Sequence, residues 1–180
     1  QGLHSPLGRA GTRASDVNRG VVLSCPQLQA AGPARRYRLY AEVSTGTIDG
    51  ELIRPGRFDH SEINGDQVES VQLEFDWPEN ALRLRDGEDS RRVTLRPGTH
   101  DRLSYLLAAR DLARRGSGGQ RLPIATRDAT EDTMLDVIGR RSLDLPVGKV
   151  DAVGVRRIGS DPDEHRELWF SEGLTPLPLR

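Results

Sequence analysis

Three residues with the chemistry of a hydrolase lie close together in the chain, namely His100, Asp101 and Ser104. On a helix, residues four apart share one face, so the His100 imidazole could act as a base towards the Ser104 hydroxyl. Asp101 could then orient the imidazole. The sequence around Ser104 has no Gly-x-Ser-x-Gly turn and no evident oxyanion donors, so the hydrolase is kept only as an alternative.

A structural role explains the same residues more simply. Thr99 is expected to be the N-cap of a helix, where its hydroxyl would accept a first-turn N–H group. Asp101 would accept backbone N–H groups near the positive end of the helix dipole, and Ser104 would bond within the turn. We therefore predict structural capping by Thr99, Asp101 and Ser104, no catalytic residue, and a protein that is not an enzyme.

No metal site and no cofactor are predicted. An acidic loop at residues 161–164 lacks the glycine and the spacing of a calcium-binding loop. Gly116–Gly119 is not followed by the Lys-Ser/Thr pair of a phosphate-binding loop. The histidines are scattered, without the spacing of a ligand pair: His4, His60, His100 and His165.

The element that must position the first three residues is a helix predicted over about residues 99–115. Leu103, Leu106 and Leu107 recur at i, i+3 and i+4 and form an apolar stripe. Gly116 is a natural residue to follow the last turn. A helix of about four turns needs a sheet to bury its leucines.

Short runs of alternating apolar and polar residues, joined by tight turns, make up most of the remaining sequence. The clearest run is Val71–Trp77, in which every second residue is apolar. Asn64-Gly65 is a typical hairpin turn. The pattern predicts a mainly β fold, an antiparallel meander that forms a strongly curved sheet or an incomplete barrel with one packed helix.

The chain is predicted to have two parts. Residues 1–36 are rich in Gly, Ala, Pro, Ser and Arg, which favours a flexible leader. Residues 37–180 are predicted to form a single antiparallel β domain. Within it, Leu174–Arg180 contains two prolines, which favours an edge strand.

Composition excludes several classes of function. The chain has 26 Lys and Arg against 27 Asp and Glu, for a net charge of −1, and no basic stripe. Nucleic-acid binding is therefore not expected. No apolar run approaches the roughly 18 residues of a membrane-spanning helix, so any membrane association is expected to be peripheral. The single cysteine, Cys25, cannot form an internal disulfide. The protein is expected to be a monomer.

Several blocks of sequence occur in an order that resembles a known family. The blocks are Phe75–Trp77, Leu95–Ser104, Gly119–Ala125, Leu145–Val150, Glu167–Phe170 and Leu177–Leu179. Over about residues 37–180 the chain resembles domain of unknown function family 3108, a family of exported Gram-negative proteins. His100 stands where the family usually has Gln.

The resemblance implies a periplasmic or envelope-associated protein whose precursor carries a signal peptide. It also implies an architecture like the open half-barrels that carry or sense lipoproteins and lipids. The family has no agreed biochemical activity, so the resemblance supplies no mechanism.

Together these observations predict a non-enzymatic envelope domain that binds a hydrophobic ligand, either a lipid or an acyl chain, or a partner such as a lipoprotein or envelope protein. Few aromatic residues are available for the core, which suggests a bent sheet with one helix as its plug. The predicted ligand contacts are Leu103, Leu106, Leu107, Trp77 and Trp169.

Simpler or different roles stay open beside this prediction. Packing in the core or at its rim is the simpler explanation for the two tryptophans. The hydrolase remains a second hypothesis for the protein as a whole. A third is an interaction module that pairs with a partner through Leu174–Arg180.

Overall fold

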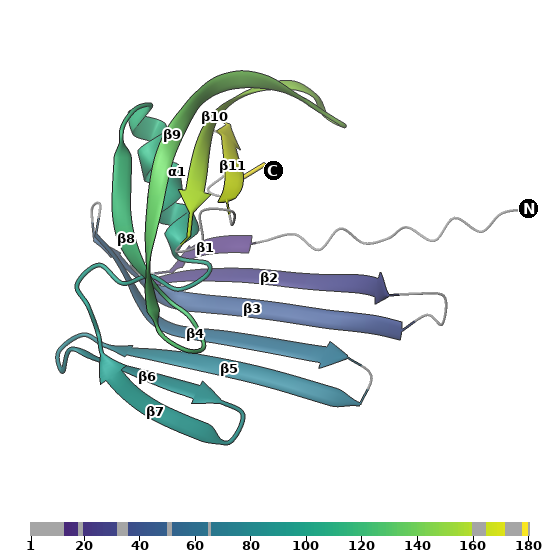
Figure 1. The fold of residues 1–180 in the computed structure, drawn as a ribbon. Helices are drawn as coiled ribbons and strands as arrows, with labels where there is room; N and C mark the ends of the chain where they lie inside the picture. The colour runs from purple at the N-terminus through teal and green to yellow at the C-terminus, as the bar shows by residue number, and fades with distance from the viewer. Residues whose placement is uncertain are drawn as a thin grey trace, which may run out of the picture.

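The structure is a computed structural model of the 180-residue chain. It describes residues 13–17, 20–31, 36–49, 52–64, 66–159, 165–171 and 178–179. These residues form eleven strands in two antiparallel sheets and one helix (Figure 1). The sequence-based prediction of a mainly β, antiparallel fold with one helix is confirmed.

The larger sheet is a meander in which each strand pairs with the next along the chain. Its strands are β1 (Arg13–Val17), β2 (Gly20–Ala31), β3 (Arg36–Asp49), β4 (Leu52–Asn64), β5 (Gln67–Asp76), β6 (Ala81–Asp86) and β7 (Asp89–Thr94). The helix α1 (Tyr105–Arg115) follows. The smaller sheet has the order β11-β10-β9-β8. It contains β8 (Gly119–Ala125), β9 (Thr130–Leu145), β10 (Gly148–Ile158) and β11 (His165–Ser171).

The division into two sheets refines the expected single curved sheet. After β7, Pro97 and Gly98 turn the chain away from the sheet, and Gly98 takes a φ of +72° that suits glycine. Among the described strands, no pairing joins the two sheets, so the barrel is not closed. The β9–β10 hairpin instead arches away from the helix and over the far ends of the larger sheet (Figure 1).

The first part of the chain differs from the prediction. Residues 1–36 are expected to be a flexible leader, whereas Arg13–Val17 and Gly20–Ala31 are strands of the larger sheet. β2 pairs along its whole length with β3, which supplies backbone partners that composition alone does not reveal. The expected edge strand Leu174–Arg180 lies outside the described residues, except for Pro178 and Leu179. The Leu179 N–H donates to the Trp169 carbonyl at 2.7 Å.

The main core, which is mostly aliphatic, lies between the two sheets and the helix. Alternation along β5 buries Val71, Leu73 and Phe75, as the sequence predicts. These side chains belong to the same core as Leu112 of α1 and Leu135 of β9. We call the face of the larger sheet that carries Leu73 its inner face, and the opposite face its outer face.

The helix begins six residues later than predicted, at Tyr105 rather than near Thr99. His100 is held in extended form because its N–H donates to the Pro123 carbonyl at 2.9 Å and its carbonyl accepts from the Ala125 N–H at 2.7 Å. These bonds dock residue 100 in parallel beside β8, so it cannot be helical. The N-cap position is Ser104.

Thr99 is therefore not the N-cap, which corrects the prediction. Its hydroxyl donates to the Arg96 carbonyl at 2.7 Å and closes the turn that follows β7. The other end of the helix agrees with the sequence. Gly116 has a φ of +74°, and its N–H donates to the carbonyls of Leu112 and Ala113.

Candidate functional site

The buried carboxylate of Asp101 fastens the turn before α1 to the larger sheet. Its Oδ1 accepts from the N–H groups of Leu103 and Ser104, each at 2.8 Å. Its Oδ2 accepts from the hydroxyl of Ser44 on β3 at 2.6 Å. The Ser104 hydroxyl in turn accepts from the Asp101 N–H at 2.9 Å. Burial raises the pKa of Asp101, against the lowering effect of these hydrogen bonds.

His100 lies beside this turn, and its buried Nδ1 has no hydrogen-bond partner among the described residues. Burial lowers the pKa of His100 to about 4, and a backbone hydrogen bond with Ser104 opposes the shift. The imidazole is therefore neutral at pH 7. The Asp101 carboxylate is used by Ser44, Leu103 and Ser104 rather than by the imidazole. The arrangement acts as a structural anchor between a loop and two sheets.

The leucine stripe of the helix fills the space beneath it. Leu103 and Leu107 are buried, and Leu106 packs against the same core from a half-buried position. A hollow of about 10 Å³ lies between Leu107 and the start of β4 at Ile53. That volume is about enough for one water molecule.

The two tryptophans lie apart and serve different clusters. Trp77 stacks on Phe75 with ring centroids 6.2 Å apart, and its Nε1–H donates to the Pro55 carbonyl at 2.7 Å. Trp169 is buried in a second, smaller cluster with Leu143. The Arg141 guanidinium lies 4.0 Å from the Trp169 ring centroid. Of the predicted ligand contacts, Leu103, Leu106, Leu107 and Trp77 therefore share one core cluster, and only Trp169 lies in another.

A groove that the sequence did not reveal lies between the inner face of the larger sheet and the β8–β9 turn. A hollow of about 70 Å³ has an apolar floor of Phe58, Val71 and Leu73. A second hollow of about 310 Å³ adjoins it along the β6–β7 hairpin. Arg127 lines both hollows, so we call them together the inter-sheet groove.

The polar wall of the first hollow contains His60, Arg102, Thr126 and Arg127. Arg102 lies 47% exposed at the rim, with its Nη1 3.5 Å from Oε1 of the buried Glu42. The same Glu42 oxygen lies 3.4 Å from His60 Nδ1. Glu42 Oε1 and His60 Nδ1 have no hydrogen-bond partner in the part of the chain that the structure describes, so the two atoms lie close together without a hydrogen bond between them.

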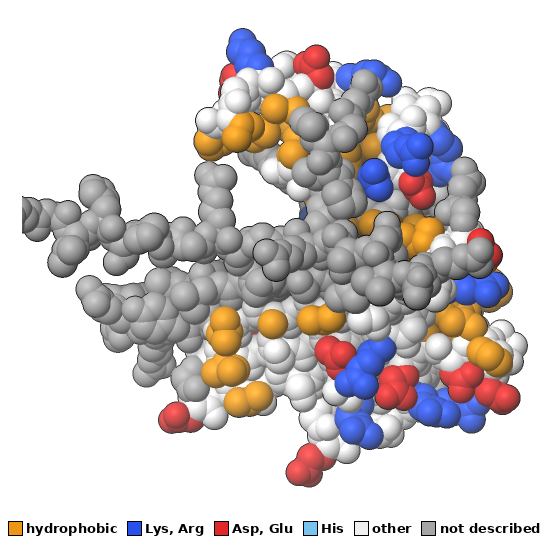
Figure 2. Space-filling model, turned by 180° about the vertical axis from the view of Figure 1, so that it is seen from behind, with side chains coloured by type: hydrophobic (Ala, Val, Ile, Leu, Met, Phe, Trp, Pro, Cys, Tyr) orange, Lys and Arg blue, Asp and Glu red, His pale blue; other side chains and the backbone are white. Residues whose placement is uncertain are grey.

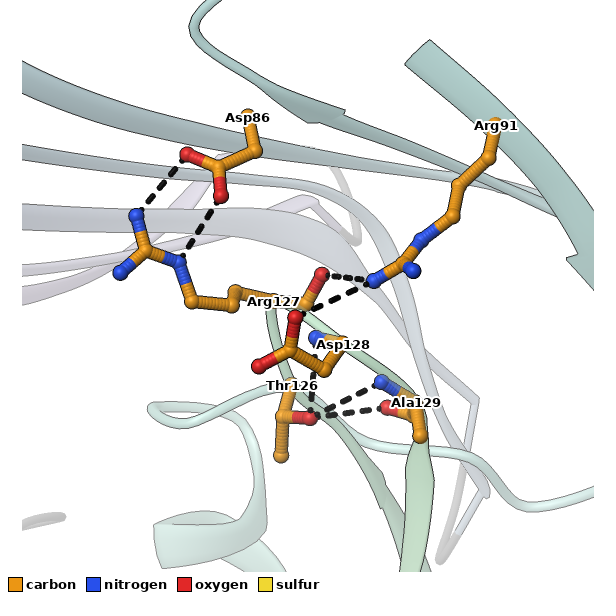
Figure 3. Close-up of polar contacts among 6 residues, drawn as sticks. All are labelled: Asp86, Arg91, Thr126, Arg127, Asp128 and Ala129. Atoms are coloured by element: carbon orange, nitrogen blue, oxygen red, sulfur yellow. Dashed lines mark hydrogen bonds and ion pairs between the residues drawn. The ribbon is translucent and has the colours of Figure 1, made fainter. Parts of the chain in front are cut away.

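The β8–β9 turn is held over the groove by a set of contacts that we call the latch, formed by Asp86, Arg91, Arg127 and Asp128 (Figure 3). Arg127 binds Asp86 with two parallel bonds, Nε to Oδ2 at 3.0 Å and Nη2 to Oδ1 at 2.9 Å. Arg91 Nη2 donates to the Arg127 carbonyl at 2.5 Å. The same nitrogen also reaches Asp128 Oδ1 at 3.4 Å.

The turn itself is shaped by Thr126. Its N–H donates to the Ala129 carbonyl at 2.8 Å, and its hydroxyl donates to the same carbonyl at 3.0 Å. The hydroxyl oxygen also accepts from the Ala129 N–H at 3.2 Å. This compact turn presents Arg127 towards β6 and the Arg127 carbonyl towards β7 (Figure 3).

Two kinds of site are absent from the described parts of the chain. No three His, Cys, Asp or Glu side chains in those parts are grouped so that they could hold a metal ion. No helix formed by the described residues has the length and apolar character needed to cross a membrane.

Comparison with known proteins supports the fold and the family. Among solved structures, the chain is similar to a β-barrel-like protein of domain of unknown function DUF1849 from Brucella abortus. The two share 9% identity with a TM-score of 0.56, over 89% of this chain and 75% of the other. A search of curated proteins finds no match. The family described as "Protein of unknown function (DUF3108)" matches residues 27–180.

Proposed function

Since the chain belongs to the DUF3108 family, as its sequence blocks predict, we propose a function from the geometry of the groove. The protein is a non-enzymatic domain that binds an amphiphile, an acyl chain with an acidic head, in the inter-sheet groove. Export to the bacterial envelope, which the resemblance implies, is part of this proposal. No step of it requires a catalytic residue or a cofactor.

The combination of an apolar floor with guanidinium groups at the rim carries the proposal. Phe58, Val71 and Leu73 form an apolar floor that is almost fully buried in this structure, and displacement of the β8–β9 turn would uncover it for an acyl chain. Arg102 and Arg127 stand beside this floor with 47% and 45% of their side chains exposed. The planar fork of a guanidinium matches the oxygens of a carboxylate or a phosphate. An amphiphile would therefore satisfy both parts of the groove.

The latch determines how much space the ligand has. The hollow of about 70 Å³ is smaller than the several hundred Å³ of typical ligand sites. Asp86 and Arg127 are 42% and 45% exposed, and surface ion pairs contribute about 1 kcal/mol or less. Moving Arg127 off Asp86 is therefore inexpensive, and it would join this hollow to the neighbouring one of about 310 Å³.

This location replaces the helix stripe as the proposed ligand contact. The core under α1 is filled by its own leucines, with a hollow of only about 10 Å³ beside Leu107. The groove lies instead along β4, β5 and the β8–β9 turn. The acyl chain is thus proposed to lie on the sheet rather than under the helix.

A filled-groove variant tests the proposal. Ala125 is buried and lines the first hollow, so Ala125→Leu should occupy the space of the acyl chain. We expect palmitate affinity to fall at least about tenfold, because each methylene kept in water forfeits about 0.8 kcal/mol. Affinity is measured by displacement of a fluorescent acyl probe and by native mass spectrometry.

The matched control is Ala152→Leu. Ala152 is also a buried alanine that lines a hollow, but it lies on β10 of the smaller sheet, away from the groove. This variant should bind palmitate like the wild type. The proposal is wrong if the wild type shows no palmitate-bound mass, or if both leucine variants bind equally well.

The acidic head is tested with Arg102→Gln. Loss of the guanidinium should weaken the binding of palmitate. It should leave the binding of hexadecanol, which has the same chain length and no charge, unaffected. Arg83→Gln is the control, because Arg83 pairs with Glu74 on the outer face, away from the groove. If the affinities for palmitate and hexadecanol fall equally, the proposal that the groove recognises an acidic head is wrong.

A further inference from the structure

We propose that the end of the molecule formed by the starts of β3 and β5, the end of β4 and the β9–β10 turn contacts the surface of a lipid bilayer. We call this region the apolar end and define it by Leu39, Ile63, Val68 and Val147. The inference goes beyond ligand binding in the groove, because it depends on the outer surface of the fold and not on the groove residues.

The placement of exposed apolar side chains is the first observation. Five large hydrophobic side chains are exposed among the residues whose side chains the structure describes. Four of them belong to the apolar end, and the fifth, Leu52, starts β4 at the opposite end of that strand. Exposed apolar residues scattered over a surface need no explanation, whereas a group at one end does.

The three residues of the larger sheet form one continuous row. Leu39 on β3 is the direct register partner of Ile63 on β4, and Ile63 is the partner of Val68 on β5. Side chains alternate between the two faces along a strand. Ser44 and Phe58, which are register partners, are buried on the inner face, and Leu39 and Ile63 each lie an odd number of residues from them. The row therefore lies on the outer face. The row leaves Val68 70% exposed.

The fourth residue lies on the other sheet. Val147 occupies the tight turn between β9 and β10 and is 83% exposed. Figure 1 places this turn on the same side of the molecule as the starts of β3 and β5 and the end of β4. Seen from behind, apolar side chains gather at that end on both the larger sheet and the arching hairpin (Figure 2).

The separation of the two parts favours a bilayer over a folded partner. Protein interfaces need a contiguous, well-packed apolar centre. Here the apolar residues stand on two sheets that no strand pairing joins among the described strands. A bilayer surface is apolar a few ångströms below its headgroups and deforms around separate insertions, so it can bury both parts at once.

Charge indicates which kind of bilayer is bound. Within two residues of the four apolar positions, the sequence has two basic residues, Arg38 and Lys149, and three acidic ones, Glu62, Asp66 and Glu69. The balance is 2 − 3 = −1, so no positive field draws this end to anionic lipid. Binding should therefore rest on apolar insertion and should occur on vesicles of neutral phosphatidylcholine.

Vesicle flotation with the full chain provides the test. We expect the wild type to float with phosphatidylcholine vesicles, with little change between low salt and about 1 M NaCl, where charge interactions are screened. The double variant Val68→Asp, Val147→Asp should lose binding by a factor on the order of a hundred, since each valine gives up its burial. Both side chains are mostly exposed, so the melting temperature should not change.

The matched control is Leu52→Asp, which places the same charge on an exposed apolar position at the opposite end. It should float like the wild type. The proposal is overturned if the wild type does not float with neutral vesicles, if it floats only with anionic vesicles at low salt, or if Leu52→Asp loses binding as the double variant does. A wild type that dimerises in solution and ignores vesicles would equally overturn it and assign the apolar end to a second copy.

Discussion

At the scale of single residues, Asp101 fastens the turn before the helix to the larger sheet. Asp101 accepts three hydrogen bonds, two from within the turn before the helix and one from Ser44 that joins this turn to β3. A carboxylate with three donors is well satisfied, which offsets much of the cost of its burial. His100 contributes its backbone to β8 and leaves its imidazole neutral in the interior.

The buried imidazole makes the fold sensitive to acid. The pKa of His100 is about 4 in the folded protein against an ordinary value of 6.5, so between these values the unfolded chain binds more protons. The contribution of the neutral His100 to the free energy of unfolding is therefore fully present above pH 6.5, and it is lost as the pH falls towards 4. A difference of that size corresponds to roughly 3 kcal/mol.

His100→Gln should remove this loss, because glutamine does not titrate. We expect urea denaturation between pH 7 and pH 4 to show a decline in the wild type that exceeds that of His100→Gln by roughly 3 kcal/mol. Comparing the two chains at each pH cancels the effect of Asp101, whose raised pKa acts in the opposite direction. His165→Gln, at an exposed position, is the control and should follow the wild type.

At the scale of elements, the latch controls the β8–β9 turn. It joins that turn to the β6–β7 hairpin through side chains that are 36 to 41 residues apart in the chain. Because its ion pairs are exposed, it fixes a conformation without adding much stability. The turn is therefore the part of the groove wall best able to move.

Asp86→Asn should loosen the turn and leave the fold intact. We expect faster hydrogen exchange at the amides of residues 126–129 and a loss of stability of about 1 kcal/mol or less. Palmitate affinity should be retained, because the opened groove is the proposed bound state. Glu79→Gln breaks a surface pair with Arg92 elsewhere and should leave exchange at 126–129 unchanged. Unchanged exchange in Asp86→Asn would mean that the remaining contacts hold the turn, namely Arg91 on the Arg127 carbonyl and Glu69, whose Oε2 lies 3.6 Å from Arg127 Nη2.

Local patterns explain how much of these elements the sequence could predict. The end of the helix follows from Gly116, and the inner face of β5 follows from the alternation of Val71, Leu73 and Phe75. The start of the helix could not be predicted in this way, because His100 is held by backbone bonds to a strand more than twenty residues later. The residue type of Asp101 indicated that its carboxylate accepts N–H groups in the turn, but Ser44, its partner on β3, lies 57 residues away in the chain.

The groove escaped prediction for the same reason. Its floor comes from β4 and β5, its rim from the turn before the helix, and its latch from β6, β7 and the β8–β9 turn. Spacing along the chain carries no signal for such a meeting of distant segments.

At the scale of the whole molecule, the proposals place two functions on separate surfaces. The groove lies between the sheets, and the apolar end lies on the outer face and at the tip of the β9–β10 hairpin. A domain of this form would meet a membrane with one end and hold an acyl chain in its interior.

If the two surfaces are separate, a substitution in one of them should abolish one activity and leave the other unchanged. We expect Ala125→Leu to float with phosphatidylcholine vesicles like the wild type but to bind palmitate more weakly. The Val68→Asp, Val147→Asp variant should bind palmitate in solution but should no longer float with the vesicles. If one variant loses both activities, the two surfaces are a single site and the separate assignments fail.

The docking of His100 beside β8 has a consequence for how the protein comes apart. The bonds from residue 100 to Pro123 and Ala125 close a loop of chain whose contents are the helix and most of β8. Because the chain that leads into the helix is tied to β8 by these bonds, we expect the helix and β8 to open together, as one foldon at the edge of the smaller sheet.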